Sequence, residues 1–358
     1  MKNYKFALVG CGRISGKHID AINEIENTSI VAVCDINIDK AKATADKIGD
    51  INFYSTYDEM LQNEDIDIVS ILTPSGLHAE QTIDIVKKYK KHMVVEKPMA
   101  LKLEDADEMI KVCDANSVRL FVVKQNRYNL PVQKLRQAVE NGSFGKMVMG
   151  TVRVRWCRPQ EYYDMDAWRG TWELDGGVIT NQASHHIDLL EWMLGEPISV
   201  MAKTKTYLSD IEVDDTAAAI ISFENGSMGI VEATTAVRPK DLEGSLSILG
   251  ENGSVVIGGF AVNKMETWNF KDTSEEESKK IVKKYSELPP NVYGFGHQRY
   301  LEHVIDCIEN NKQALVDGFE GRKSLELINA MYESAETGKE VFLRFHPNKS
   351  RLGKKVER

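Results

Sequence analysis

Five short apolar runs in the first third of the chain constrain the fold more than any other feature. They lie at residues 4–10, 29–35, 67–74, 92–98 and 119–125, and amphipathic segments of helical character separate them. Apolar runs without polar alternation are typical of strands that are buried on both faces of a sheet. Strands that alternate with helices predict a parallel sheet with helices on both sides. We therefore expect an α/β domain over residues 1–124.

The pattern changes after this domain. A helix-like segment ends near Gly142, and strand-like segments then dominate, with a helix at about 183–194 and further helices after Tyr300. Two strand junctions carry the same sequence, Glu-Asn-Gly-Ser, at 224–227 and 251–254. Asn-Gly between apolar strands is a strong hairpin signal, because both residues tolerate positive φ. The second half is therefore expected to contain a large, mostly antiparallel sheet.

The length of 358 residues is sufficient for two domains with cores of their own. The second domain is predicted at residues 125–345, as an α+β domain for substrate binding and oligomer contacts. The last residues, 346–358, are polar and basic, and we expect them to form a frayed tail.

Composition excludes several classes of protein. The net charge of −9 argues against a general affinity for nucleic acid or an anionic membrane. No apolar run approaches the roughly 18 residues that span a bilayer, and no signal peptide is expected before the first strand. The five cysteines form no CxxC pair and no metal-ligand spacing, so we expect reduced thiols, no metal site and a cytoplasmic location.

A glycine-rich turn follows the first apolar run, in ALVGCGRISG. Gly10 allows a tight turn, and Gly12 lets the backbone approach a pyrophosphate at the N-terminus of the next helix. Ser15 takes the third glycine position of the dinucleotide fingerprint, and Asp35 ends the second strand where an acid would bind a ribose 2′-hydroxyl. The acid favours NAD over NADP. A Rossmann-like domain that binds another ligand is the alternative.

Two further motifs lie at the ends of predicted parallel strands, TPSGLH at residues 73–78 and Glu96-Lys97-Pro98. Ligands of such sheets bind at the carboxyl ends of the strands, so both motifs are expected to face the cofactor. A nearby positive nicotinamide and partial burial both favour the neutral amine of a lysine, which suits Lys97 to proton transfer, with Glu96 to hold it. A structural ion pair at a strand end explains the motif equally well.

A third motif lies in the second half, at residues 175–197, where a Gly-Gly turn and Asn181 precede a helix that carries two histidines. His185 is a candidate general base, because imidazole titrates near neutral pH. Asp188 lies three residues further on and is expected to share its helix face. A lone histidine is more often structural, although a polar loop before it favours a functional role.

The set of motifs, in this order and spacing, resembles the Gfo/Idh/MocA oxidoreductases over nearly the whole chain. The resemblance implies that Lys97 and His185 flank the sugar carbon that is oxidised, that the Lys97–Pro98 bond is cis, and that the second sheet builds a homotetramer. Many sugar and inositol dehydrogenases of the family have Asp where this chain has Asn181. The implied cofactor contacts are Gly10, Gly12, Arg13, Ile14, Asp35, Thr73, Ser75, His78, Glu96, Lys97, Asn126, Trp168 and Arg169.

Residues 153–172 carry a narrower resemblance, to the UDP-N-acetyl-glucosaminuronate 3-dehydrogenases of bacterial surface-polysaccharide synthesis. This stretch holds four arginines, two tyrosines and three tryptophans, which suit a diphosphate, a carboxylate and flat rings. Arg153 and Arg155 alternate along a predicted strand, so an oligomer surface is the alternative. The implied substrate contacts are Lys97, Arg155, Arg158, Tyr163, Asn181 and His185.

The expected reaction is oxidation of the C3 hydroxyl of UDP-N-acetyl-glucosaminuronic acid (UDP-GlcNAcA) by NAD. His185 takes the hydroxyl proton and Lys97 polarises the oxygen, although the reverse assignment of the base remains open. NADH either leaves the enzyme or is reoxidised in place by 2-oxoglutarate. The alternatives are another sugar or inositol dehydrogenase of the family, an NAD-assisted glycosidase, and a non-catalytic sensor that binds dinucleotide.

Overall fold

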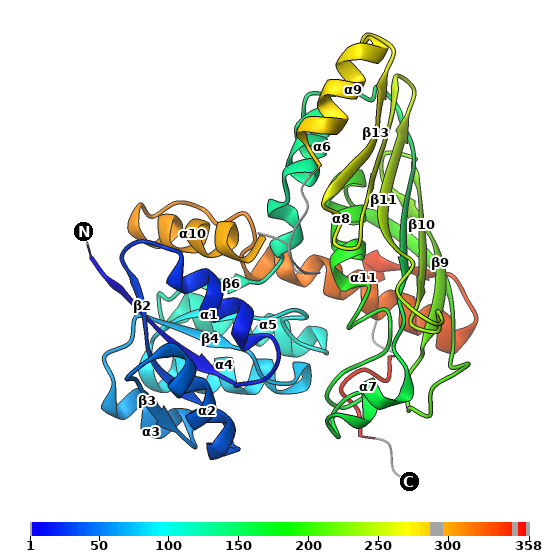
Figure 1. The fold of residues 1–358 in the computed structure, drawn as a ribbon. Helices are drawn as coiled ribbons and strands as arrows, with labels where there is room; N and C mark the ends of the chain where they lie inside the picture. Colours follow the sequence, from blue (N-terminus) through cyan, green and yellow to red (C-terminus); the bar gives the residue numbers. More distant parts are fainter. Residues whose placement is uncertain (1, 287–295, 346–349, 356–358) are drawn as a thin grey trace. The chain divides into compact units, whose positions relative to one another are not determined.

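A computed structural model describes residues 2–286, 296–345 and 350–355. The chain forms two compact units (Figure 1). The first unit comprises Met1–Gln125 and His297–Arg322, and the second comprises Asn126–Gly296 and Lys323–Arg358. Residues 297–322 therefore belong to the first unit. The sequence analysis assigned them to the second domain, because helical periodicity does not show which sheet a helix packs against.

The first unit is built on a six-stranded parallel sheet with strand order β3-β2-β1-β4-β5-β6. This doubly wound order confirms the predicted Rossmann fold. The strands are β1 (Tyr4–Val9), β2 (Thr28–Cys34), β3 (Asn52–Tyr54), β4 (Ile68–Ile71), β5 (His92–Val95) and β6 (Leu120–Val122). The five predicted strands are all present. The sixth, β3, is a three-residue edge strand, too short and exposed to leave an apolar run.

Helices separate these strands in the chain, as the alternation predicted. They are α1 (Ser15–Asn23), α2 (Ile38–Ile48), α3 (Tyr57–Asn63), η1 (Ser75–Leu77), α4 (His78–Tyr89) and α5 (Leu103–Ala115). From His297 on, α10 (Gly296–Glu309) also belongs to this unit, although it comes much later in the chain. Local capping fixes some of their starts: Asn37 accepts from the backbone N–H groups of Asp39 and Lys40 at α2. The central strands between them are buried on both faces, which explains their continuous apolar sequences.

The second unit is built on an eight-stranded sheet with strand order β13-β12-β11-β7-β10-β9-β8-β14. Its strands are β7 (Met147–Arg155), β8 (Pro197–Lys205), β9 (Thr216–Phe223), β10 (Met228–Thr234), β11 (Glu243–Gly250), β12 (Gly253–Gly258), β13 (Lys264–Phe270) and β14 (Val341–Phe342). Neighbouring strands are antiparallel except β7 and β10, which run parallel. Both Asn-Gly turns join antiparallel neighbours, as predicted.

One face of this sheet is covered by α8 (Ser184–Leu194), whose residues are nearly all buried. The helix can approach closely because Gly150 lies beneath it: a Cβ there would be 2.7 Å from Leu190 Cδ1 and 2.9 Å from Leu194 Cδ1. The remaining helices that lie wholly or partly in this unit are η2 (Gln125–Tyr128), α6 (Leu130–Glu140), α7 (Gln160–Asp164), α9 (Glu275–Lys284), α11 (Gly318–Thr337) and η3 (Leu343–Phe345). Figure 1 shows β9, β10, β11 and β13 as strands of this one sheet.

The C-terminal segment differs from the prediction where it is described. Residues 346–349 and 356–358 lie outside the described residues, but Leu352 is only 2% exposed. The Gly353 N–H donates to the Trp172 carbonyl oxygen at 2.7 Å. A frayed tail is therefore wrong for residues 350–355, which pack within the second unit. All five cysteines are free thiols, and no helix among the described residues is long and apolar enough to cross a membrane.

Candidate active site

The two glycines of the turn after β1 have opposite surroundings. Gly10 has a φ of +103°, and a Cβ there would lie 2.8 Å from the Leu72 carbonyl carbon and oxygen at the end of β4. A side chain would therefore be strained and would clash with backbone. At Gly12 the opposite holds, because a Cβ would meet no atom within 4 Å. The turn thus packs tightly on the sheet at its first glycine and is open at its second.

The open side of this turn leads into the N-terminus of α1. Ile14 is the N-cap residue and provides no side-chain acceptor, and the first turn contains no acidic side chain. Ser15, at the third glycine position, is buried and donates from Oγ to the Gly12 carbonyl oxygen at 2.7 Å. Arg13 is exposed beside it. Uncapped N–H groups, the positive end of the helix dipole and a nearby arginine suit a pyrophosphate.

Asp35 lies just beyond β2, next to the glycine turn. Its Oδ2 accepts from the Cys11 backbone N–H at 2.8 Å, and its Oδ1 accepts from the Asn37 backbone N–H at 2.8 Å. Two backbone donors therefore fix the carboxylate, and each oxygen retains a lone pair for a ribose hydroxyl. The turn and this acid together fit a dinucleotide with a free 2′-hydroxyl.

The loop after β4 contains the next predicted contacts. Thr73 donates from Oγ1 to Gln81 Oε1 at 2.7 Å, and Ser75 is buried at the start of η1. The His78 ring nitrogens lie 2.8 Å from the carbonyl oxygens of Pro98 and Thr73. Burial lowers the pKa of His78. His78 therefore joins the loops after β4 and β5, and its contact with the cofactor stays a prediction.

The Glu-Lys-Pro motif follows β5, and the Lys97–Pro98 bond is cis, as the resemblance implied. Lys97 is half-buried, whereas Glu96 is buried. Glu96 Oε1 lies 2.9 Å from His18 Nε2, and Glu96 Oε2 accepts from the Lys97 backbone N–H at 3.1 Å. The Glu96 carboxylate is thus engaged with the main chain of Lys97 and with a histidine that the sequence analysis missed. His18 is a polar residue on the buried face of α1, and that position was the available signal.

In the second unit, His185 lies in the first turn of α8 and is buried. Asp188, three residues further along the helix, pairs with Arg127, with Nε–Oδ2 and Nη2–Oδ1 distances of 2.8 and 2.9 Å. Both side chains are almost completely buried, and the Arg127 guanidinium stacks 4.8 Å from the Trp192 ring centroid. The two-pronged ion pair fixes the start of α8 and with it His185.

The loop before α8 is also held internally. Asn181 donates from Nδ2 to Asp175 Oδ1, and Asp175 Oδ2 accepts from the Gly170 backbone N–H at 2.8 Å. Asn181 therefore uses its amide to fix a buried carboxylate six residues earlier in the chain.

Asn126, a predicted cofactor contact, is buried in η2.

Two residues predicted to contact the substrate have partners within the protein. Arg155 pairs with Glu232 through Nε and Nη2, at 2.6 and 2.8 Å, and with Glu243 at 3.1 Å. Its charge is neutralised on the face of the sheet that it shares with Arg153, which agrees with the alternative of a protein-contact surface. Tyr163 is buried, its hydroxyl lies 3.0 Å from Thr235 Oγ1, and burial raises its pKa to about 12. Its position indicates a core residue.

The other members of that stretch form an arginine–aromatic cluster, which we define as Arg158, Tyr162, Trp168 and Arg169. Arg169 donates from Nη1 to the Tyr162 hydroxyl at 2.8 Å, and its guanidinium lies 4.5 Å from the Trp168 ring centroid. Arg158 lies 5.4 Å from the Tyr162 ring and pairs with Asp241 at 3.0 Å. Stacked rings hold both guanidinium groups in fixed orientations.

Together, the parallel sheet, the glycine turn and the fixed aspartate define a two-domain dinucleotide-dependent oxidoreductase. Residues 4–124 match the oxidoreductase family's NAD-binding Rossmann fold, and residues 136–343 match its C-terminal alpha/beta domain. The chain belongs to the Gfo/Idh/MocA oxidoreductase family. It is an NAD-dependent dehydrogenase, and the glycine turn and Asp35 are the parts of this structure that fit the cofactor.

One solved structure is similar to this chain over nearly its full length. The WlbA dehydrogenase from Bordetella pertussis, in complex with NADH and UDP-GlcNAcA, is 42% identical, with a TM-score of 0.89 over 95% of this chain and 98% of that one. Myo-inositol 2-dehydrogenase from Thermotoga maritima is 26% identical over 90% of this chain and 96% of its own length. D-glucoside 3-dehydrogenase from Escherichia coli is 24% identical over 95% and 97%.

Proposed function

We propose that this protein oxidises the C3 hydroxyl of UDP-GlcNAcA to the 3-keto sugar, in the synthesis of a diacetamido uronic acid for surface polysaccharide. The observation that carries the proposal is the 42% identity, over nearly the full length of both chains, to a WlbA dehydrogenase in complex with NADH and UDP-GlcNAcA. The inositol and glucoside dehydrogenases are about a quarter identical.

The catalytic pair in this proposal is Lys97 and His185. His185 removes the proton of the C3 hydroxyl as the C–H bond breaks, and the Lys97 ammonium donates a hydrogen bond to the same oxygen. The reverse assignment, with neutral Lys97 as the base, uses the same two residues. Bound NAD⁺ supplies the acceptor for the hydride from C3. The buried Arg127–Asp188 pair supports the role of His185, because it fixes the helix that carries the imidazole.

The diphosphate and the C6 carboxylate are proposed to bind the arginine–aromatic cluster, with Arg158 as the main contact. Tyr162 and Trp168 hold the guanidinium groups of this cluster in fixed orientations, so little side-chain entropy is lost on binding. Trp168 and Arg169 are proposed to reach the cofactor as well. Asn181 is proposed to contact the sugar from the loop that Asp175 holds.

The face of the second sheet opposite α8 is the proposed tetramer contact. Apolar side chains there are exposed in alternation along neighbouring strands, at Met201, Ile220, Met228 and Leu249. The ion pairs of Arg153 and Arg155 lie on the same face. Large apolar groups on an open sheet face favour burial against another copy of the chain. A cytoplasmic location is part of the proposal, since nucleotide sugars are made there.

An absorbance assay for NADH tests this function. Protein, NAD⁺ and UDP-GlcNAcA are mixed with and without 2-oxoglutarate, and the sugar is analysed by mass spectrometry. NADH that rises without the keto acid indicates free exchange of the cofactor, and conversion only with it indicates reoxidation in place. Lys97→Ala and His185→Ala are each expected to lower turnover by about a hundredfold or more. Lys87→Ala, at an exposed lysine of α4, is the control.

A second candidate is a dehydrogenase of a free sugar or inositol, because the curated relatives include such enzymes. The same assay, run with each substrate in turn, distinguishes the two candidate functions. Turnover of myo-inositol or a glucoside without turnover of UDP-GlcNAcA would support the second candidate and remove the proposed role of the arginine–aromatic cluster.

A further inference from the structure

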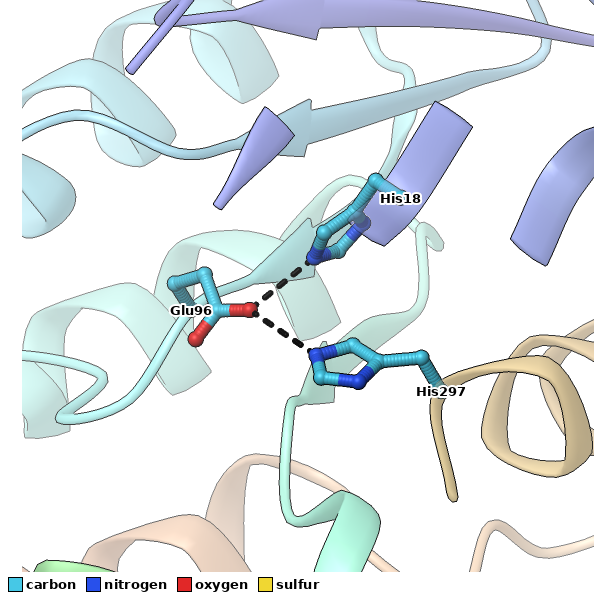
Figure 2. Close-up of side chains that lie close together, drawn as sticks. All are labelled: His18, Glu96 and His297. Carbon is cyan, nitrogen blue, oxygen red and sulfur yellow. Dashed lines mark hydrogen bonds and ion pairs between the residues drawn. The ribbon is translucent and has the colours of Figure 1, made fainter. Parts of the chain in front are cut away.

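Three buried titratable side chains meet inside the first unit (Figure 2). His18 comes from α1, Glu96 from the end of β5, and His297 from the first turn of α10, where the chain returns to this unit. His18 Nε2 lies 2.9 Å from Glu96 Oε1, and His297 Nε2 lies 3.8 Å from the same oxygen. Figure 2 shows both rings directed at that oxygen. Three segments distant in the sequence therefore converge on one carboxylate.

These residue types can bind a metal, and their ligand atoms all lie within 4.8 Å of one another. A metal would require the three atoms to surround a shared point at about 2.1 Å from each. The 2.9 Å between His18 Nε2 and Glu96 Oε1 is instead the length of an N–H···O hydrogen bond. Both imidazoles face the oxygen itself, so the geometry is that of a carboxylate that accepts a hydrogen bond from His18, with the His297 ring close by at 3.8 Å.

The second oxygen of the same carboxylate connects the cluster to Lys97. Glu96 Oε2 accepts from the Lys97 backbone N–H at 3.1 Å. Glu96 is 6% exposed, and a buried carboxylate is costly unless hydrogen bonds and opposite charges compensate for lost hydration. The His18 imidazole and the Lys97 main chain provide those hydrogen bonds, and the His297 ring lies 3.8 Å from the same carboxylate. The position of Lys97 is thus tied to a carboxylate that depends on His18 and His297.

The charge of Glu96 follows from the groups that face it. Burial raises its pKa, but hydrogen bonds from His18 and His297 outweigh burial and hold the pKa well below its usual value. Among the described residues, His78 on α4 and Lys97 are further titratable groups close to it. Burial in turn lowers the pKa of His297, and Lys17 on α1 adds to this effect. Glu96 therefore remains an anion as long as His18 donates to it and His297 lies beside it.

We propose that His18 and His297 are positioning residues, which hold the Glu96 carboxylate against the Lys97 backbone N–H. They thereby position Lys97 for its proposed catalytic role. Both histidines are buried. The inference rests on the proposed function for the catalytic role of Lys97, but not for the identity of the sugar. It predicts that replacing either histidine perturbs Lys97, because Glu96 then becomes protonated at a higher pH.

The kinetic test compares His18→Leu with His18→Gln, because glutamine keeps an N–H donor at about the distance of the imidazole Nε2. Turnover is measured from pH 5.5 to 9, and NAD⁺ affinity is measured by tryptophan fluorescence. His18→Leu should lose about tenfold of kcat at pH 6 and recover near pH 8.5, because Glu96 without its donor becomes protonated at a higher pH. His18→Gln and the control Asn23→Ala, at an exposed residue of α1, should follow the wild-type profile.

His297→Leu should shift the profile in the same direction but less, since its nitrogen is 3.8 Å from the carboxylate rather than 2.9 Å. NAD⁺ affinity should be unchanged in all variants. A uniform loss of kcat at every pH in both His18→Leu and His18→Gln would show a merely structural role and overturn the proposal. A wild-type profile in folded His18→Leu would overturn it as well.

A second measurement needs no substrate, so it separates this inference from the proposed function. Reaction of Lys97 with trace acetic anhydride is followed by mass spectrometry from pH 7 to 11, in wild type and Glu96→Gln. Loss of the neighbouring anion should move the midpoint for Lys97 to lower pH, since an opposite charge favours the ammonium form. An unchanged midpoint would overturn the link between Glu96 and Lys97, whichever sugar the enzyme oxidises.

Discussion

Asp214 gives the most quantitative prediction about stability. Its carboxyl group is buried in the second unit, where Oδ2 accepts from the Val178 backbone N–H at 3.1 Å and Tyr332 is a further hydrogen-bond partner. Burial nevertheless raises the pKa of Asp214 to about 7. The folded protein therefore keeps a proton near neutral pH that the unfolded chain has already released.

The direction and size of the effect on stability follow from the linkage between proton binding and folding. The folded pKa of about 7 lies above the value of 3.8 for an unperturbed aspartate, so the stabilisation is fully present below about pH 4 and is lost as the pH rises through 7. The difference of about three pH units, at about 1.4 kcal/mol each, corresponds to about 4 kcal/mol. Asp214→Asn replaces the carboxyl group by a neutral amide that does not titrate, so its stability should not fall over this range.

Thermal unfolding of wild type and Asp214→Asn from pH 4.5 to 8.5 measures this effect. The difference between their midpoints should move in favour of the variant by on the order of 8 °C across this range, at about 2 °C per kcal/mol. The pH-dependent contributions of the other carboxylates are the same in both proteins and cancel in the difference between their midpoints. The control is Asp210→Asn, at an exposed residue of the same loop. A midpoint difference that does not change with pH would refute the reasoning.

Three further predictions concern single contacts. Asp188→Ala leaves the buried Arg127 guanidinium without its carboxylate, and urea unfolding should show a loss of about 3–5 kcal/mol, whereas a loss under about 1 kcal/mol would contradict the ion pair's importance. Gly10→Ala places a Cβ 2.8 Å from the Leu72 carbonyl and should weaken NAD⁺ binding by about tenfold or more in a fluorescence titration; unchanged affinity is the contrary result. Asp35→Ala should reduce the kcat/KM preference for NAD⁺ over NADP⁺ by about tenfold or more, and an unchanged preference would exclude the ribose contact.

Much of the fold could be predicted because its signals are local. The five buried strands of the first unit are continuous apolar runs, and the two Asn-Gly turns mark hairpins wherever they occur. The strands that escaped prediction, β3, β13 and β14, are short or lie near a sheet edge and lack a continuous apolar sequence. The return of residues 297–322 to the first unit is a long-range event with no local signature.

The site could be predicted less well, because the partners of its residues lie far away in the sequence. Arg155 looked available for a diphosphate, but Glu232 and Glu243, 77 and 88 residues further on, neutralise it. The hydroxyl of Tyr163 is taken by Thr235 in the same way. The glycine turn and the cis Lys97–Pro98 bond were accessible, because their geometry is tied to a contiguous motif.

Oxidation at C3 of the nucleotide sugar is the central claim, and transfer of a labelled hydride tests it most directly. UDP-GlcNAcA that carries deuterium at C3 is incubated with the enzyme and NAD⁺, and the cofactor, or 2-hydroxyglutarate where 2-oxoglutarate is added, is analysed by mass spectrometry. The account predicts that the deuterium appears in the reduced product. Conversion of the sugar with no deuterium in that product would contradict oxidation at C3, and no conversion at all would contradict the choice of substrate.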